Sequence, residues 1–373
     1  MAKSFAKFLL ITCNIAVAIS FIIGCYGSDF KSGKYWFLGL FTLASLYFLL
    51  ALIIFIFFWL LVKPKYAFIG VIAIACCWMP LKNLIGIHPL DEFNNKKEES
   101  QIRVMNWNVE LFNLLNYKTA PGKKFEMIDL VHELKPDIFC MQEMAASDNS
   151  PKAINYMPDI MKRMGKFDYY YYYNPVHDFD RDHHFGMVIA SRYPIIKQES
   201  ESYNRKRYNA TFIYADIAKG KDTFRVFNIH LQTLHFSEIN RKYLEDFSLS
   251  DDAYIENSKN IISKYKKGLI ERRTQSDFIK KHLDQSPYPV ILCGDFNDVP
   301  NSYAYRTIGE NLKNAFAEKG IGIGATFNGI SPTLRIDNIF CSPSFDVRQY
   351  DRFKNKLSDH FPIVADLAFS KTP

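Results

Sequence analysis

Residues 290–298, VILCGDFND, decide the fold, because an apolar run of strand-forming residues ends there in a group of acids and amides. The run VILC is typical of a buried strand. Asp295 and Asn297 follow it two positions apart, so in an extended chain their side chains lie on one face. A carboxylate at the end of a buried strand costs free energy unless a cation or a hydrogen-bond donor satisfies it. The stretch therefore predicts a polar site at the edge of a sheet.

The same arrangement recurs along the chain from about residue 101 onward. Apolar runs bordered by polar residues are IRVMNWNV (102–109), DIFCMQE (137–143), TFRVFNIHL (223–231), RIDNIFCS (335–342) and SDHFPIVADLAF (358–369). Further strand candidates are YYYYYNPV (169–176), FGMVIASR (185–192) and ATFIYADI (210–217), and helical patterns cover 123–135, 151–165 and 270–284. Many strands with few helices between them indicate two packed sheets with helices on the outside.

The strand ends carry residue types that can bind a hard cation and a phosphate. Taken singly, a glutamate after a strand is usually solvated and a histidine is usually structural, but a whole set at separate strand ends is hard to explain as surface decoration. Oxygen ligands with few thiolates suit Mg²⁺ or Mn²⁺ better than zinc. A cation on phosphate oxygens, with histidine as acid or base, is typical of phosphoester hydrolysis. The set comprises Asn106, Asn108, Glu143, His230, Asp295, Asn297, Asp337, Asp359 and His360.

In their order along the chain, WNV, QE, NIHLQ, GDFND, IDNIF and SDHFPI resemble the motifs of the endonuclease/exonuclease/phosphatase superfamily. The resemblance covers about residues 101–370, and GDFN followed by a C-terminal SDH is its most specific part. It implies a four-layer α/β sandwich of the deoxyribonuclease-I type and an active phosphoric ester hydrolase, in which water attacks phosphorus in line. It also implies a Mg²⁺ or Mn²⁺ cofactor, with Glu143 as principal ligand, Asn108 beside the metal and Asp359 as a further carboxylate.

The resemblance implies catalytic roles for five more residues. Asp295 would orient or deprotonate the attacking water, or hold a second metal, and Asn297 would contact the phosphate. His360 would hydrogen-bond the phosphoryl oxygens or act as a base, held in one tautomer by Asp337. His230 would bind phosphate or protonate the leaving oxygen.

Two loops offer candidates for substrate binding. His183 or His184, just before a strand that resembles the family's strand ending in a serine–basic–aromatic–proline turn, could reach substrate, although exposed loop histidines are the simpler interpretation. Arg205, Arg207 and Asn209 form a basic turn where family members often contact phosphate; surface charge is the alternative.

The N-terminal part is apolar enough to enter a membrane. The sequence predicts a bundle of about three transmembrane helices, near residues 8–28, 36–62 and 66–87, of which the third could instead be a buried helix. The first lacks a small-x-small cleavage site, so we expect it to be retained. We therefore divide the chain into a transmembrane region (1–89), a polar linker (90–100) and a catalytic domain (101–373).

The positive charge belongs to the membrane part. Residues 1–89 contain seven lysines, no arginine and one acid, a net charge of +6, whereas residues 90–373 contain 39 basic and 38 acidic residues. A nearly neutral domain weakens the argument for a nucleic-acid partner. The lysines around the spans favour an internal N-terminus. We therefore expect an integral protein of a bacterial inner membrane with its catalytic domain facing outward, toward the periplasm.

Three functions agree with these features. The first is a membrane-anchored phosphodiesterase or phosphatase acting on a phospholipid head group or another small phosphoester. The second is a membrane-tethered nuclease, and the third is a non-catalytic membrane scaffold. Residues 236–268 form a charged excursion, either a surface helical insertion or a lid over the site. The three cysteines after residue 101 lack metal-binding spacing and are expected to be buried thiols.

Overall fold

The computed structural model describes residues 2–30, 33–89, 93–116, 118–147, 162, 170–178, 183–204, 210–234, 251–329 and 331–370. Its α-helices are α1 Ala2–Tyr26, α2 Leu38–Leu43, α3 Ser45–Val62, α4 Ala67–Cys76, α5 Trp78–Leu84, α6 Lys123–Leu134, α9 Asp251–Asp284, α10 Tyr303–Gly309 and α11 Ala315–Lys319. Short 3-10 helices are η1 Gly27–Asp29, η2 Gly33–Tyr35, η3 Pro64–Tyr66 and η4 Glu110–Asn116. The strands are β1 Gly86–Ile87, β2 Ile102–Asn108, β3 Ile138–Ser147, β4 Tyr170–Asp178, β5 His183–Ser191, β6 Ile195–Ser202, β7 Thr211–Lys219, β8 Asp222–His230, β9 Val290–Asp295, β10 Lys313–Asn314, β11 Ile321–Gly322, β12 Asp337–Cys341, β13 Phe345–Arg352 and β14 Ile363–Phe369.

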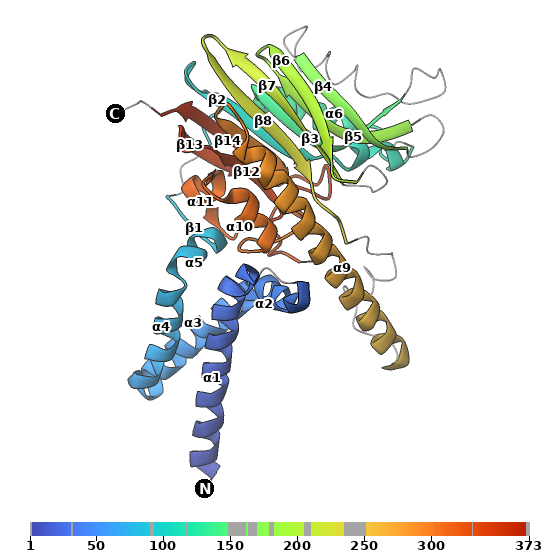
Figure 1. The fold of residues 1–373 in the computed structure, drawn as a ribbon. Helices are drawn as coiled ribbons and strands as arrows, with labels where there is room; N and C mark the ends of the chain where they lie inside the picture. Colours follow the sequence, from blue (N-terminus) through green and yellow to red (C-terminus); the bar gives the residue numbers. More distant parts are fainter. Residues whose placement is uncertain are drawn as a thin grey trace.

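Two six-stranded sheets form the centre of the part that follows residue 101 (Figure 1). The strand orders are β13-β14-β2-β3-β5-β4 and β10-β12-β9-β8-β7-β6. In each sheet one central pair is parallel, β2 with β3 and β8 with β9. The other neighbours among the described strands are antiparallel. The carboxyl ends of the two parallel pairs carry the residues that the sequence singled out.

Alternation along the strands explains why the sheets stack in four layers. Val104 and Cys140 of one sheet face Ile291 of the other across an apolar core. Trp107, on the other face of β2, packs under α6. Phe227 of the second sheet packs under α9 and α10. The predicted four-layer α/β sandwich is therefore confirmed, and all three cysteines of this part are buried.

Helix α6 shows how local sequence places a covering layer. Met127, Val131 and Leu134 recur at helical spacing and are buried against the sheet. The helix ends at Leu134. Lys135 caps it with a left-handed backbone (φ 49°) and is followed by Pro136. The helix predicted over 123–135 is thus confirmed.

The charged segment 236–268 is helical from residue 251 onward. Helix α9 runs over 34 residues and joins the predicted helix 270–284 to residues 251–268 in one rod. Residues 235–250 lie outside the described residues, as does nearly all of the helix predicted over 151–165.

Two of the longer strands were not predicted, and both lie at sheet edges. β6 reads IIKQESES and β13 reads FDVRQYDR, and each has one open side in its sheet. Edge strands carry charged residues that prevent pairing with other chains, which hides the apolar alternation.

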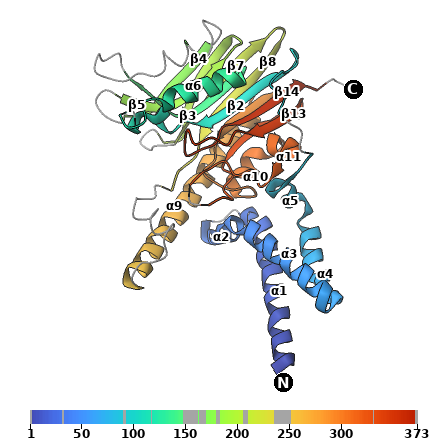
Figure 2. The same ribbon diagram turned by 180° about the vertical axis from the view of Figure 1, so that it is seen from behind.

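The N-terminal helices project from one side of the sandwich (Figure 2). Two of them, α1 and α3, are long and apolar enough to cross a membrane, and α4 with α5 would make a third span if this pair acts as one despite a bend of 75°. The span predicted over 36–62 is broken at Ala44, where α2 gives way to α3. Two to three apolar helices therefore precede the catalytic part.

Candidate active site

Six chain segments bring the predicted polar residues to one edge of the two sheets. The ends of β2, β8 and β9, the bulge inside β3, the start of β12 and the loop before β14 meet there. Strand β12 runs antiparallel to β9, so its first residue, Asp337, pairs with the last residue of β9, Asp295. The residues brought together are Asn108, Glu143, His230, Asp295, Asn297, Asp337, Asp359 and His360.

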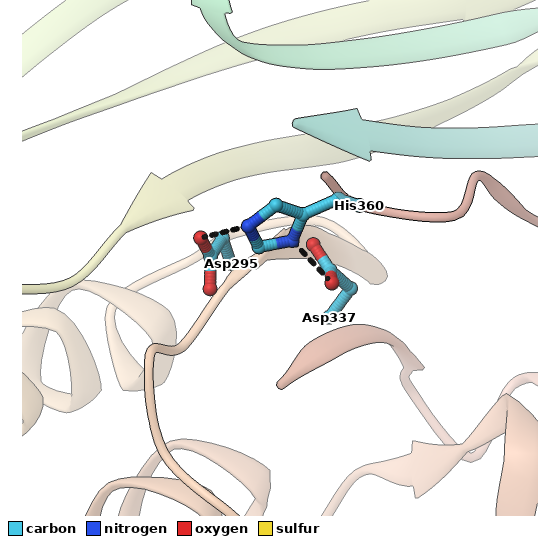
Figure 3. Close-up of side chains that lie close together, drawn as sticks. All are labelled: Asp295, Asp337 and His360. Carbon is cyan, nitrogen blue, oxygen red and sulfur yellow. Dashed lines mark hydrogen bonds and ion pairs between the residues drawn. The ribbon is translucent and has the colours of Figure 1, made fainter. Parts of the chain in front are cut away.

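His360 lies between two buried carboxylates (Figure 3). Its Nδ1 is 2.9 Å from Asp337 Oδ2, and its Nε2 is 3.7 Å from Asp295 Oδ2. Trp107 Nε1 donates to the His360 carbonyl at 2.9 Å, which fixes the backbone. Burial opposes protonation of the ring, but Asp337 and Asp295 outweigh it and hold the pKa of His360 well above its usual value. The two carboxylates therefore favour the protonated ring, whose Nε2 faces the site.

Asp295 is held from two sides. Its Oδ1 accepts from the backbone N–H of Asn297 at 2.8 Å, and its Oδ2 accepts from Asn297 Nδ2 at 3.3 Å and from Asn108 Nδ2 at 3.2 Å. Burial raises the pKa of Asp295, while His360 opposes the rise. Asn297 adopts a left-handed backbone (φ 49°), which asparagine tolerates and which turns the chain sharply after β9.

His230 lies between the carboxylates of Glu143 and Asp295 at the centre of the site. Its Nε2 lies 3.6 Å from Glu143 Oε1 and 3.6 Å from Asp295 Oδ2. The ring is almost buried at the end of β8, where His230 pairs with Asp295 of β9. An imidazole in this position can pass a proton to or from a group bound between the two acids.

Glu143 lies at a β-bulge. The register of β3 against β5 shifts between Met141 and Met144, and Glu143 itself has a φ of 53°. A bulge re-aims the side chain that it contains, here toward the site edge. Burial raises the pKa of Glu143 to about 7, with Asp359 adding to the rise and His360 opposing it.

Glu110 is a site residue that the sequence analysis missed. Its Oε2 accepts from the backbone N–H of Asp359 at 3.0 Å. Burial, together with Asp359 and Glu143, raises the pKa of Glu110. The only sequence signal was its place two residues after Asn108, in WNVE, and nothing there predicts the left-handed turn (φ 46°) that brings it inward.

Asn108 faces the site with its amide nitrogen. Its Oδ1 accepts from the Glu110 N–H at 3.2 Å, while its Nδ2 points to Asp295. In this arrangement Asn108 positions a carboxylate by donating to it. Its role beside a metal stays a prediction.

Asn106 does not share the site with Asn108. It belongs to a buried polar network between the two sheets, in which Gln142 Nε2 donates to Asn106 Oδ1 at 2.7 Å and to Asn228 Oδ1 at 2.6 Å. Asn228 in turn donates to the carbonyls of Met141 and Val188. The network ties the two sheets together directly beneath the site, since it includes the residue before Glu143.

Carboxylates at this edge fit a divalent cation. Glu143, Glu110 and Asp359 are acids that repel one another, and burial disfavours the charged forms of Glu143 and Glu110. A bound cation would offset both effects. Asp295, Asp337 and His360 also offer three ligand atoms within 4.8 Å. In that second group the 2.9 Å contact of His360 with Asp337 is a hydrogen bond, which an ion would have to break. The Glu143 side is therefore the better cation site, and oxygen ligands favour Mg²⁺ or Mn²⁺.

Of the substrate-binding candidates, only His183 and His184 lie among the described residues. His184 lies on β5 opposite Ala146 of β3, and its ring centre is 5.6 Å from that of Tyr173. Arg205, Arg207 and Asn209 lie outside the described residues.

A sequence profile of the endonuclease/exonuclease/phosphatase family matches residues 105–360, which include every residue of the cluster. The chain belongs to the endonuclease/exonuclease/phosphatase family. Members of this family are generally hydrolases that act on phosphoesters, and they typically depend on a divalent metal. A second profile, of a domain of unknown function, matches residues 6–84. No curated protein matches the chain.

Solved structures of this family share the fold. An endonuclease/exonuclease/phosphatase from Bacteroides vulgatus is 18% identical, with a TM-score of 0.54 over 73% of this chain and 100% of its own. A mannosyl-6-phosphatase from Bacteroides thetaiotaomicron is 19% identical, with a TM-score of 0.50 over 72% and 100%. The human nocturnin catalytic domain with bound sulfate is 17% identical, with a TM-score of 0.51 over 74% and 97%. At these identities the likeness establishes the architecture of this family member and leaves its substrate open.

Proposed function

We propose that the chain is a membrane-anchored, Mg²⁺- or Mn²⁺-dependent phosphoester hydrolase that acts on a phosphoester at the bilayer surface, such as a phospholipid head group. The observation that carries the proposal is the position of His360, which is held by Asp337 and faces Asp295, the carboxylate that His230 also approaches at one sheet edge. Acids, an oriented imidazolium and a second histidine in one cluster suit the transfer of a phosphoryl group to water.

Each residue has a task that follows from its position. Asp295 accepts two amide donors and lies 3.6 Å from His230, so its carboxylate can orient or deprotonate the attacking water. His360 donates from Nε2 to a phosphoryl oxygen, while Asp337 keeps the ring in place. His230 protonates the leaving oxygen. A cation held by Glu143, with Asp359 or Glu110 nearby, would offset the charge that develops on the phosphoryl oxygens.

The loops that carry the site also contact the apolar helices. Asn301, six residues after Asp295, donates to the Pro80 carbonyl at 3.0 Å and accepts from Asn83 at 2.9 Å. Phe327 packs on the His360 ring with centres 5.0 Å apart, and Ser331 of the same loop is 3.0 Å from the Tyr47 hydroxyl of α3. A site built on these loops would open close to the membrane surface. This placement supports a substrate that resides in the bilayer.

A membrane-tethered nuclease is the second candidate, because nucleases share this family's fold. The nearly neutral charge of residues 90–373 argues against it, since binding to nucleic acid relies on clustered basic residues. We further propose that the protein is integral to a bacterial inner membrane, with the catalytic domain on the outer side, as the lysine distribution favours.

A hydrolysis panel on the full-length protein in nanodiscs tests the proposal. With Mg²⁺ or Mn²⁺ present, we expect turnover of phospholipid or a soluble bis-aryl phosphate, and little turnover of plasmid DNA or RNA. Asp295→Ala and His360→Ala should abolish it, whereas Arg348→Ala, on the exposed edge strand β13, should not. Wild-type turnover in either site variant would refute the assignment, and preferred cleavage of DNA would favour the nuclease.

A further inference from the structure

A cleft lies where the N-terminal helices meet the catalytic domain. Its walls come from the segment between α1 and α3 on one side and from α9 and α10 on the other. None of the nine residues of the candidate active site, Glu110 included, lines it. The lining includes Ser28, Trp36, Arg273, Asp298, Ser302 and Tyr303.

The residues around the cleft indicate where it would lie relative to a membrane. It lies beside the segment that connects the end of α1 with the start of α3, the two helices able to span a membrane. That segment exposes the aromatic side chains of Phe30, Tyr35 and Phe37. Exposed aromatic residues between two spans are typical of the membrane–water interface. With α1 and α3 crossing a bilayer, the cleft would lie at the level of the lipid head groups.

Arg273 offers an unused donor in this cleft. Its Nη2 donates to the Phe30 carbonyl at 2.6 Å, and its guanidinium lies over the Tyr303 ring, 4.7 Å from the centre. Its Nη1 is buried and has no hydrogen-bond partner among the described residues. A buried N–H of a charged group without an acceptor is costly, so the position favours an anion.

The acids near Arg273 are already engaged. Asp298 accepts from Arg272 Nε at 3.0 Å, and Asp277 accepts from the Tyr303 hydroxyl at 2.6 Å. Lys266 adds a positive charge at the rim, over the Trp36 ring at 5.5 Å. An incoming anion therefore meets a positive rim and a guanidinium whose neighbouring carboxylates have other partners.

We propose that this cleft binds the phosphate of an anionic phospholipid, with Arg273 as its principal ligand, and that the bound lipid holds the catalytic domain on its anchor. The proposal rests on the proposed membrane anchoring and is independent of the hydrolytic reaction. A head group at this depth would place its phosphate beside Arg273 and Lys266, and its acyl chains along the apolar helices.

Thermal unfolding of the full-length protein in nanodiscs tests this site. Nanodiscs of phosphatidylcholine alone would be compared with nanodiscs that also contain phosphatidylglycerol. We expect the anionic lipid to raise Tm by several degrees in the wild type and in Arg273→Lys. Arg273→Gln, which keeps a donor for the Phe30 carbonyl but loses the charge, should lose this increment. Tyr265→Phe, which removes only the adjacent hydrogen bond to the Gly39 carbonyl, should keep it.

Two results would overturn the proposal. One is that phosphatidylglycerol raises the Tm of Arg273→Gln as much as it raises that of the wild type. The other is an equal increment from inorganic phosphate in phosphatidylcholine nanodiscs, which would assign the cleft to a free anion. Turnover of a soluble bis-aryl phosphate, measured on the same samples, separates the two proposals: an inactive wild type that still shows the increment contradicts the hydrolase and leaves the lipid site standing.

Discussion

At the scale of single residues, the neighbours of His360 should determine how activity depends on pH. Asp337 and Asp295 keep the pKa of the ring well above its usual value, so the imidazolium persists at neutral pH. Asp337→Asn removes one of these charges and lowers that pKa. We expect turnover to fall by about 100-fold or more, the usual range for a misplaced acid–base group. The alkaline limb of the pH–rate profile should move to lower pH; an unshifted limb would mean that another group carries the proton.

Glu143 leads to a prediction about metal binding. Its raised pKa, about 7, means that the metal-free fold prefers the protonated carboxyl, and this preference is lost as pH rises through that value. A cation requires the ionised form, so it competes with the proton below pH 7. Mg²⁺ should therefore raise Tm more at pH 8 than at pH 6. Glu143→Gln should show a small increment at both values, and an equally strong pH dependence in that variant would contradict the role of Glu143.

At the scale of elements, the sequence predicts most central strands and the edge at which they carry polar residues. Apolar runs such as VILC need only burial to form, and a carboxylate at their end marks the site. The bulge that turns Glu143 inward depends on how β3 pairs with a distant strand, so no local pattern reveals it. Glu110 is hidden for the same reason. His230 and Asp295 were found because each simply ends its strand.

The pairing of β8 with β9 leads to a prediction of its own. A Cβ at Gly294 would lie 2.2 Å from the Ile229 carbonyl oxygen, and Gly294 immediately precedes Asp295. Gly294→Ala should force the two strands apart, destabilise the domain by about 2 kcal/mol or more, and abolish activity. Gly122→Ala, beside which the nearest atom is 4.0 Å away, is the matched control. Equal melting temperatures for the two variants would show that the strands can adjust.

At the scale of the whole molecule, the N-terminal helices and the sandwich meet through several independent contacts. Strand β1, just after α5, pairs with β11, and buried Arg335 donates to the Asn83 carbonyl while its guanidinium lies over Phe316. These contacts join segments far apart in the sequence, so the sequence could predict an anchor and a hydrolase but not how they are fixed to each other. A fixed orientation would hold the site at a constant height above the bilayer.

Asn301 provides the means to test whether this orientation matters. Its backbone is left-handed (φ 65°), so Asn301→Gly keeps the turn while removing both hydrogen bonds to α5. Asn311 has nearly the same φ, 64°, and Asn311→Gly is the control. If the anchor presents the site to the bilayer, Asn301→Gly should lower turnover of a vesicle-borne phospholipid several-fold and leave turnover of a soluble bis-aryl phosphate unchanged, with Asn311→Gly altering neither. A parallel loss on both substrates in Asn301→Gly would instead show that the loop supports Asp295 directly, and that the junction only stabilises the site.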